Sequence, residues 1–147
     1  MEIEVKEIKE EIKDSIKVTI FCNKITKRIQ KLRTHIEAFD ERIKGKQEGE
    51  VVYARMAEAL YFEAVDNRTF LYMEQQVMEV EQRLYELEKL LPEEDFIRCS
   101  KSVIVNIHKI KRLKPELNRT ILATMCNGEK ISISRRYVKA FKELLGI

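Results

Sequence analysis

The sequence predicts an α+β protein that is mostly β. Short runs rich in Val, Tyr and Phe follow one another between residues 50 and 80. Two more segments of alternating pattern cover residues 96–114 and 119–134. The three-and-four spacing of an amphipathic helix occurs in three stretches, at about residues 23–39, 79–91 and 135–145. The 147 residues suffice for one domain with a real core and a small appendage.

The first part of the chain predicts a strand followed by a helix. Every second residue of segment 16–22 is apolar, as on one face of a strand: Ile16, Val18, Ile20 and Cys22. Asn23 is a candidate N-cap, and one apolar stripe follows at helical spacing: Ile25, Ile29, Leu32, Ile36 and Phe39. The basic residues on the other faces of this helix suit either a solvated surface or DNA contact. The polar segment 42–50 carries two glycines, so we expect it to separate an extension, residues 1–45, from a domain, residues 46–147.

The first half of that domain predicts strands and one helix. The strands are expected at residues 50–56, 58–65, 69–73 and 76–80, with a hairpin turn at Asp66-Asn67-Arg68. The expected helix, residues 79–91, presents Val80, Leu84, Leu87 and Leu91 on one face, and Pro92 ends it.

The second half predicts a hairpin and a terminal helix. Segment 119–134 folds back at Asn127-Gly128, a dipeptide that suits the positive φ angles of a type I′ turn. The last helix is expected from Arg135 to Leu145, with Ser134 as N-cap and Gly146 as the stop. Its buried stripe comprises Val138, Phe141 and Leu145.

Charge is distributed unevenly, although the formal net charge is only +3. Residues 96–147 carry 12 basic and 3 acidic side chains, a charge of +9. Residues 46–95 carry 5 and 13, or −8, and residues 1–45 carry 11 and 9, or +2. Such segregation indicates an anionic partner for the C-terminal third, with nucleic acid the usual candidate. The alternative is that folding intermixes the charges and leaves an ordinary solvated surface.

Composition argues against a membrane or secreted protein. No apolar run approaches the roughly 20 residues of a membrane span, and the start of the chain is too charged for a signal peptide. Cys22, Cys99 and Cys126 are an odd number at wide spacing, which suits a reducing compartment. We therefore expect a cytoplasmic protein with buried free thiols.

The motifs argue against an enzyme. His35 and His108 are the two histidines, no CxxC or HxxxH pair occurs, and no glycine cluster could cradle a phosphate. Cys99 and His108 lack an orienting acid and an oxyanion site. The acidic run that ends at Asp95 is assigned to a solvated loop. We expect no catalytic site, no metal site and no cofactor.

Two basic stretches favour an anion site instead. Lys101 lies between serines in the stretch Ser100-Lys101-Ser102, a poor composition for a core. Arg135 and Arg136 open the last helix, where cations are mildly unfavourable because the helix N-terminus is already positive. Guanidinium groups beside unpaired helix amides form a good reader of phosphates or base edges.

These residues resemble the LytTR-type DNA-binding domain of bacterial transcription regulators. The resemblance covers about residues 46–147 and rests on four stretches: "ALYFEAVDNRTFLY", "LYELEKLLPEEDFIRCSKSVIVNIHKIKRL", "NGEKISIS" and "SRRYVKAFKELL". The second stretch is the most specific, because it carries the family's pattern at Phe96, Arg98, Ser102, Val105, Asn106 and Ile110.

The resemblance implies a mostly β, LytTR-like fold that inserts loops into the major groove of DNA. The corresponding DNA-binding residues form three groups: Asn67, Arg68 and Thr69; Ser100, Lys101 and Ser102; and Ser134, Arg135 and Arg136. Lys101 and Arg136 are expected on base edges, with Arg68 or Thr69 as the third contact. Arg135 and the serines are expected on phosphates. Arg98 and Asn106 belong to the motif and are either structural or DNA-contacting.

The resemblance also bears on partners. Residues 1–45 are too few for a receiver domain and resemble the strand–helix extension of stand-alone members. Input then comes through abundance, a partner protein such as a membrane protein, or self-association through the stripe from Ile25 to Phe39, which core packing explains as well. Family sites resemble direct repeats in double-stranded DNA, which implies two protomers on DNA and makes a homodimer an option. The alternative function is a protein-interaction or RNA-binding module that uses the same basic face.

Overall fold

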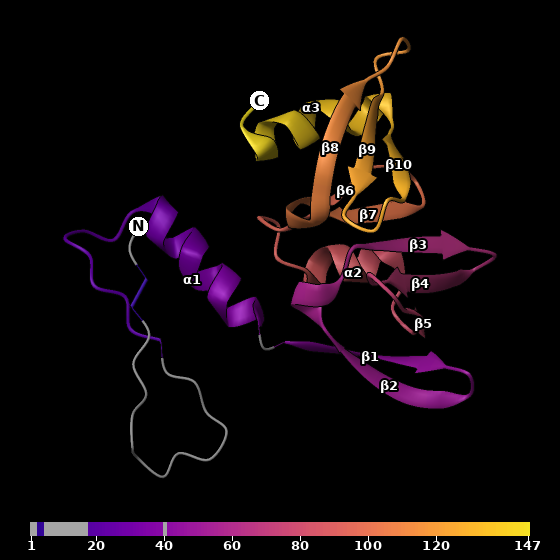
Figure 1. Ribbon diagram of the computed structural model, residues 1–147, viewed down its shortest axis with the longest axis horizontal. Helices are drawn as coiled ribbons and strands as arrows, with labels where there is room; N and C mark the ends of the chain where they lie inside the picture. Colours follow the sequence, from indigo (N-terminus) through magenta and orange to yellow (C-terminus); the bar gives the residue numbers. More distant parts are fainter. Residues whose placement is uncertain (1–2, 5–17, 40) are drawn as a thin grey trace.

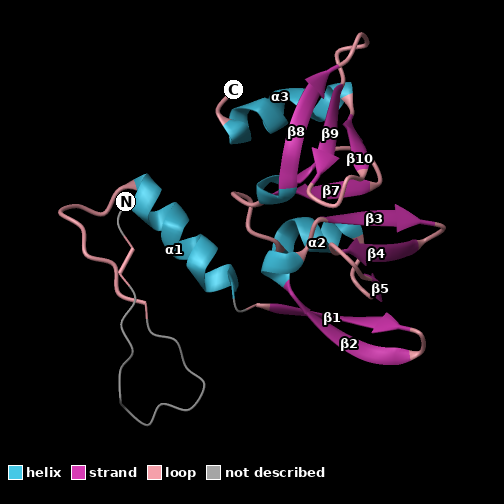
Figure 2. Ribbon diagram, viewed as in Figure 1, coloured by secondary structure: helices cyan, strands magenta, loops and turns pink. Residues whose placement is uncertain are grey.

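The computed structural model describes residues 3–4, 18–39 and 41–147 (Figure 1). These residues form an α+β structure with far more strand than helix, so the predicted fold class is confirmed (Figure 2). No helix in this part of the chain is long and apolar enough to cross a membrane.

A seven-stranded antiparallel sheet forms the larger layer, with strand order β2-β1-β5-β4-β3-β7-β6. Its strands are β1 (Arg42–Gln47), β2 (Glu50–Arg55), β3 (Tyr61–Val65), β4 (Arg68–Tyr72), β5 (Val77–Val80), β6 (Phe96–Arg98) and β7 (Val103–Asn106). The short helix α2 (Leu84–Leu90) contacts β3, β6 and β7. Leu84 and Leu87 are the buried residues of α2.

A three-stranded sheet with order β10-β9-β8 forms the second layer. Its strands are β8 (Ile110–Pro115), β9 (Ile121–Met125) and β10 (Lys130–Ile133). Helix α3 (Arg135–Leu145) packs on this sheet, as Figure 1 shows, through the fully buried Phe141. The predicted bounds of α3 are confirmed, and Gly146 ends it in the left-handed conformation.

The central strands β3 and β7 serve two hydrophobic cores. Phe62 and Ile104 belong to the core under α2, whereas Tyr61 and Val105 belong to the core under α3. Successive side chains of a strand point to opposite faces, so the same two strands form a wall of both cores.

Of the two predicted hairpin turns, the structure confirms the first and shows a different turn type at the second. Asp66 and Asn67 both have positive φ angles, 50° and 62°, so the β3–β4 turn is confirmed as a tight two-residue hairpin. At the β9–β10 turn only Gly128 has a positive φ, 88°, and the Gly128 N–H donates to the Met125 carbonyl at 2.9 Å. The type I′ expectation for Asn127-Gly128 is wrong, because that turn needs a positive φ at both residues and Asn127 has none.

The N-terminal strand prediction is not supported by the described residues. Residues 16 and 17 lie outside them, and residues 18–22 form no strand. A strand must pair with a neighbouring strand, and within the described residues no strand pairs with residues 18–22. Helix α1 (Lys27–Phe39) begins later than expected, and the Thr26 hydroxyl rather than Asn23 accepts from the Ile29 N–H, at 3.4 Å.

Two further boundaries differ from the sequence expectation. Segment 42–50, expected as a separator, contributes β1, in which Ile43 and Gly45 are buried. A Cβ at position 45 would lie 2.6 Å from the Glu79 carbonyl oxygen, so only glycine permits this approach. Val80 belongs to β5 and not to α2, because it pairs with Thr69 on one side and Gly45 on the other.

Candidate nucleic-acid interface

The three segments predicted to contact DNA lie at one end of the strands. Strand β3 is antiparallel to both β4 and β7, so the β3–β4 turn and the β6–β7 loop emerge at the same end (Figure 1). The Ala64 N–H donates to the Ser102 carbonyl at 2.8 Å, and the Ser134 N–H donates to the Cys99 carbonyl at 2.8 Å. The β6–β7 loop is thus bonded to β3 and to the start of α3, and the structure brings all three segments together.

In the first segment, the cation is already neutralised. Arg68 donates to both carboxylate oxygens of Glu79, at 3.0 and 2.5 Å, and its guanidinium lies 5.2 Å from the centre of the Phe70 ring. These hydrogen bonds lower the pKa of Glu79. Asn67 is exposed, but Thr69 is only 6% exposed and faces away from solvent.

Arg98 stabilises the second segment through hydrogen bonds to its backbone. Its side chain is 21% exposed, donates to the carbonyls of Ser100, at 2.8 Å, and Lys101, and pairs with Glu88. The Ser100 hydroxyl accepts from the Ser102 N–H at 3.2 Å. Arg98 therefore has a structural role, and the loop it holds leaves Lys101 exposed.

The third segment joins β10 to α3. Ser134 occupies the N-cap position with an extended backbone, φ −65° and ψ 146°, but its side chain makes no capping hydrogen bond. Arg135 and Arg136 in the first helical turn are exposed, and the Arg136 guanidinium lies 5.9 Å from the centre of the Tyr137 ring.

The cations of these segments fall into two groups. Arg68 and Arg98 form salt bridges, to Glu79 and Glu88. Lys101, Arg135 and Arg136 form none with any residue in the described part of the chain. An anion that meets this end of the molecule therefore finds three side-chain charges that no carboxylate of the described residues pairs.

A shallow hollow of about 230 Å³ connects the first two segments, with Asn67, Thr69 and Lys101 among its lining residues. Sequence spacing alone does not place residue 67 beside residue 101. Their proximity follows from the antiparallel pairing of β3 with β7.

Asn106 is also structural. It is 3% exposed, its side-chain amide donates to the Ala59 carbonyl at 2.8 Å, and its side-chain oxygen accepts from the His108 N–H at 3.0 Å. The hydrogen-bonding groups of this side chain are thus used inside the fold.

The cysteines differ from the expectation in part. Cys99 is fully buried, and burial raises the pKa of its thiol to about 12, which leaves it protonated and unsuited to nucleophilic chemistry. Cys22 and Cys126 are exposed, so the expectation of buried thiols is wrong for these two. All three are free cysteines.

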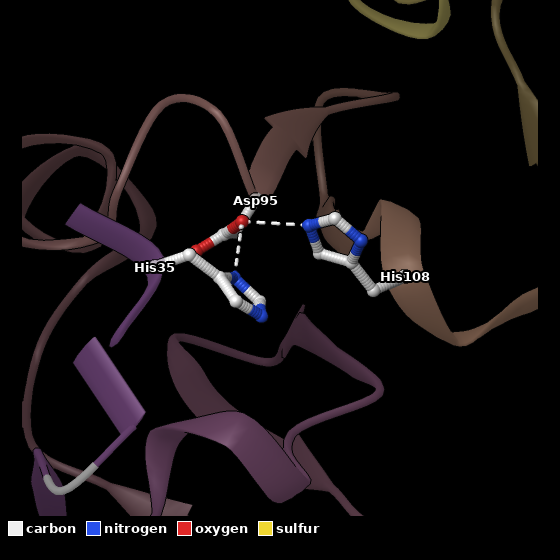
Figure 3. A group of neighbouring side chains, drawn as sticks. All are labelled: His35, Asp95 and His108. Atoms are coloured by element: carbon white, nitrogen blue, oxygen red, sulfur yellow. Dashed lines mark hydrogen bonds and ion pairs between the residues drawn. The ribbon is translucent and has the colours of Figure 1, made fainter. Parts of the chain in front are cut away.

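Sequence reasoning missed one side-chain cluster away from these loops. Asp95 is only 6% exposed, so the expectation of a solvated loop is wrong for this residue. One of its carboxylate oxygens lies 3.0 Å from the His35 Nδ1 and 2.6 Å from the His108 Nε2 (Figure 3). Asp95 is 60 positions from His35 and 13 positions from His108 in the sequence, so no local motif predicts the cluster. Because their ligand atoms all lie within 4.8 Å of one another, the group could hold a metal ion.

Comparisons with known proteins agree with the fold. Residues 49–146 match the LytTr DNA-binding domain family. The solved LytTr DNA-binding domain of a Bacillus cereus protein, described as a methyl-accepting/DNA response regulator, is similar, with a TM-score of 0.70 and 33% identity. The similarity covers 74% of this chain and 99% of that one.

Two curated relatives differ in length. The sensory transduction protein LytT of Enterococcus faecalis is 36% identical over 97 residues, which are 65% of this chain but only 40% of LytT. An uncharacterised HTH-type transcriptional regulator of Staphylococcus aureus is 30% identical over 132 residues, 88% of this chain and 89% of that protein. With a family match over residues 49–146, the chain belongs to the LytTr DNA-binding domain family.

Proposed function

We propose that this chain is a sequence-specific transcriptional regulator that inserts its three loop segments into the major groove of DNA. The observation that carries the proposal is the convergence of these segments at one end of a domain of a DNA-binding family, where Lys101, Arg135 and Arg136 form no salt bridge with any described residue. Unpaired cations supply the phosphate attraction that dominates affinity, and side chains on base edges supply specificity.

The residues divide between these two tasks. Lys101 and Arg136 are proposed to contact base edges, where Lys or Arg hydrogen-bonds to guanine. Arg135 is proposed to contact phosphate, together with the serines of the loops: Ser100, Ser102 and Ser134. Arg68, beside the exposed Asn67, is the third candidate for a base contact. Thr69 is less suited, because its side chain is buried.

A loop-based mode fits the arrangement of the helices. In the part of the chain that the structure describes, strands separate α1, α2 and α3, so no two of them form a helix–turn–helix pair. Helix α2 lies against the sheet, and α3 offers its first turn rather than a whole face to the proposed DNA.

Two protomers on a direct repeat of double-stranded DNA are proposed as the bound form, because one protomer presents a single set of three segments. Regulation is proposed to enter through residues 1–45, by self-association or through a partner protein, with a membrane protein as one candidate class. Within the described part of that region, Ile29, Leu32 and Ile36 of α1 are partly buried, whereas Ile25, just before α1, and Phe39, its last residue, are 69% and 49% exposed.

The test compares two neighbouring arginines on two duplexes: the promoter region upstream of the protein's own gene and a scrambled duplex of equal length. Arg136→Ala should lose about 1–3 kcal/mol of discrimination between them. Arg135→Ala should weaken binding to both duplexes alike and flatten the salt dependence by about one unit. Gel shifts at several salt concentrations measure both quantities.

Either of two results contradicts these assignments. An unchanged affinity ratio in Arg136→Ala removes that residue from the base edges. If the wild-type chain binds both duplexes equally and loses both as salt rises, the face is only electrostatic, and an RNA-binding or protein-interaction function replaces the proposal.

A further inference from the structure

The cluster of His35, Asp95 and His108 lies apart from the loops proposed to contact DNA, and it joins helix α1 to the domain (Figure 3). The two imidazole rings lie 4.9 Å apart between centres, at 60°. Both present a ring nitrogen to the same oxygen of Asp95, at 3.0 and 2.6 Å. Three donor atoms of the kinds that bind transition metals thus converge on one point.

The domain holds two of the three groups in place through its backbone. Asp95 precedes β6, and its carbonyl accepts from the Ile107 N–H at 2.9 Å. Asn106, the last residue of β7, pairs with Phe96, and its side-chain oxygen accepts from the His108 N–H at 3.0 Å. This β6–β7 pairing fixes where Asp95 and His108 lie, whether or not a third group is present.

The third group comes from outside the matched domain. His35 lies on α1, which precedes residues 49–146. Its side chain is 52% exposed, that of His108 is 49% exposed, and that of Asp95 is 8% exposed. A buried carboxylate flanked by two accessible imidazoles is open to an ion from solvent, and each imidazole has room to adjust.

We propose that His35, Asp95 and His108 form a binding site for a divalent transition-metal ion, with Zn²⁺ the best match, and that the bound ion fastens α1 to the DNA-binding domain. Two imidazoles and a carboxylate are an established ligand set for Zn²⁺, with a fourth position left for water or another ligand. The neutral imidazoles would turn their lone pairs to the ion, so coordination replaces the two hydrogen bonds to Asp95.

The three donor atoms lie near the spacing that a zinc site needs. Zinc–ligand distances of about 2.0–2.1 Å at tetrahedral angles place neighbouring donor atoms about 3.3 Å apart. The two nitrogen–oxygen distances, 3.0 and 2.6 Å, are slightly shorter than this, and all three atoms lie within 4.8 Å. Admitting the ion means widening these two distances by about 0.3 and about 0.7 Å and bringing the two imidazole nitrogens, at most 4.8 Å apart, to about 3.3 Å.

Attachment of α1 to the domain by the ion would affect regulation. Because the β6–β7 loop precedes β7 and His108 follows it, two residues after its last residue Asn106, the ion would connect α1 to a strand that borders the proposed DNA interface. Metal supply would then act on the chain through the placement of α1. This site stands on its own contacts and does not depend on the proposed DNA contacts.

The experiment uses the full chain without a histidine tag, in a background of Cys22→Ser and Cys126→Ser, because exposed thiolates also bind zinc. Zn²⁺ affinity is measured by competition with a chromophoric chelator, for the parent chain, His35→Ala and His108→Ala. Glu94→Gln is the matched control, since it removes a carboxylate beside Asp95 without touching the three ligands. Both histidine side chains are about half exposed, so these variants are expected to fold, which circular dichroism checks.

The expected result is one Zn²⁺ per chain, with an affinity that falls by at least about tenfold in each histidine variant, since losing an outer-shell partner alone costs that much. Glu94→Gln should bind as the parent does. Hydrogen exchange gives a second measurement: Zn²⁺ should slow amide exchange along α1, Lys27–Phe39, in the parent and not in His35→Ala.

Three results would overturn the proposal. The first is no binding of Zn²⁺ by the parent, and the second is equal binding by the parent and both histidine variants. The third is a loss in His108→Ala alone with unchanged exchange along α1, which would mean that the helix is not part of the site.

Discussion

The two halves of the domain carry opposite charge, and their cations behave differently. Residues 46–95 have a formal charge of −8, and their loop cation, Arg68, is neutralised by Glu79. Residues 96–147 have a formal charge of +9, and Lys101, Arg135 and Arg136 form no salt bridge with any described residue. Only a cation without a carboxylate partner is free to replace the counterions of a nucleic acid. The basic half should therefore supply most of the attraction for DNA.

Arg98 connects these halves. It belongs to the basic half by sequence, yet it pairs with Glu88 of the acidic half and holds the carbonyls of Ser100 and Lys101. Arg98 thus holds the β6–β7 loop in a conformation that leaves Lys101 exposed. The acidic half thus contributes a carboxylate that holds this loop of the basic half in shape.

The largest expected effect tests whether the halves are one folding unit. Phe62→Ala and Phe141→Ala each remove a fully buried ring, from different cores, and each should lower the free energy of unfolding by about 3–5 kcal/mol. Because β3 and β7 line both cores, we expect one cooperative transition in denaturant for each variant. Tyr85→Ala, at a side chain 60% exposed, is the control.

Two separate transitions in either variant would contradict this expectation. They would mean that the cores unfold independently and that the acidic half is a detachable support.

A smaller effect is expected when Arg98 is removed. Arg98→Ala breaks charge-assisted hydrogen bonds to two carbonyls and a carboxylate, and should cost about 1.5–3 kcal/mol of stability. Exchange of the Ser102 amide should accelerate, and affinity for the promoter duplex should fall. Denaturant unfolding, hydrogen exchange and gel shifts measure these quantities.

Arg98→Lys is expected to retain little of the stability and DNA affinity that Arg98 provides, because a lysine cannot reproduce the planar fork of donors that reaches two carbonyls at once. Full rescue by lysine would show that charge alone matters here and that the loop does not depend on this geometry.

These comparisons also show how far the sequence determines the fold and the interface. Alternating patterns located most strands, because one face of each is buried, and the stripe through Phe141 located α3. Local patterns failed where pairing decides the outcome. Residues 42–47 look polar, yet they form β1, since Ile43 and Gly45 alone need to face inward. Val80 has helical spacing to Leu84, yet strand partners on both sides hold it in β5.

The candidate sites show the same limit. The residues of the three loops could be named from the sequence because they resemble those of a family. The sequence could not show which of those cations is already paired, because the partner of Arg68 lies 11 positions away on another strand. The cluster around Asp95 could not be predicted either, because it assembles only when α1 packs beside the β6–β7 pair.

The smallest expected effect concerns Arg68 and sharpens the contrast between the halves. Each phosphate contact contributes about 0.9 to the slope of log affinity against log salt. Arg135→Ala should flatten the slope by about that amount, whereas Arg68→Ala should change it much less, because Glu79 already holds the guanidinium. Gel shifts or fluorescence anisotropy across a salt series measure both slopes on the promoter duplex.

Glu79→Gln is the matched variant, since it keeps the shape of the side chain while removing the charge that neutralises Arg68. It should strengthen DNA binding and steepen the slope, because a freed guanidinium can take up a phosphate. If Arg68→Ala instead flattens the slope as much as Arg135→Ala does, then Arg68 leaves Glu79 when DNA arrives. The β3–β4 turn would then count among the attracting segments, and the acidic half would no longer be only a support.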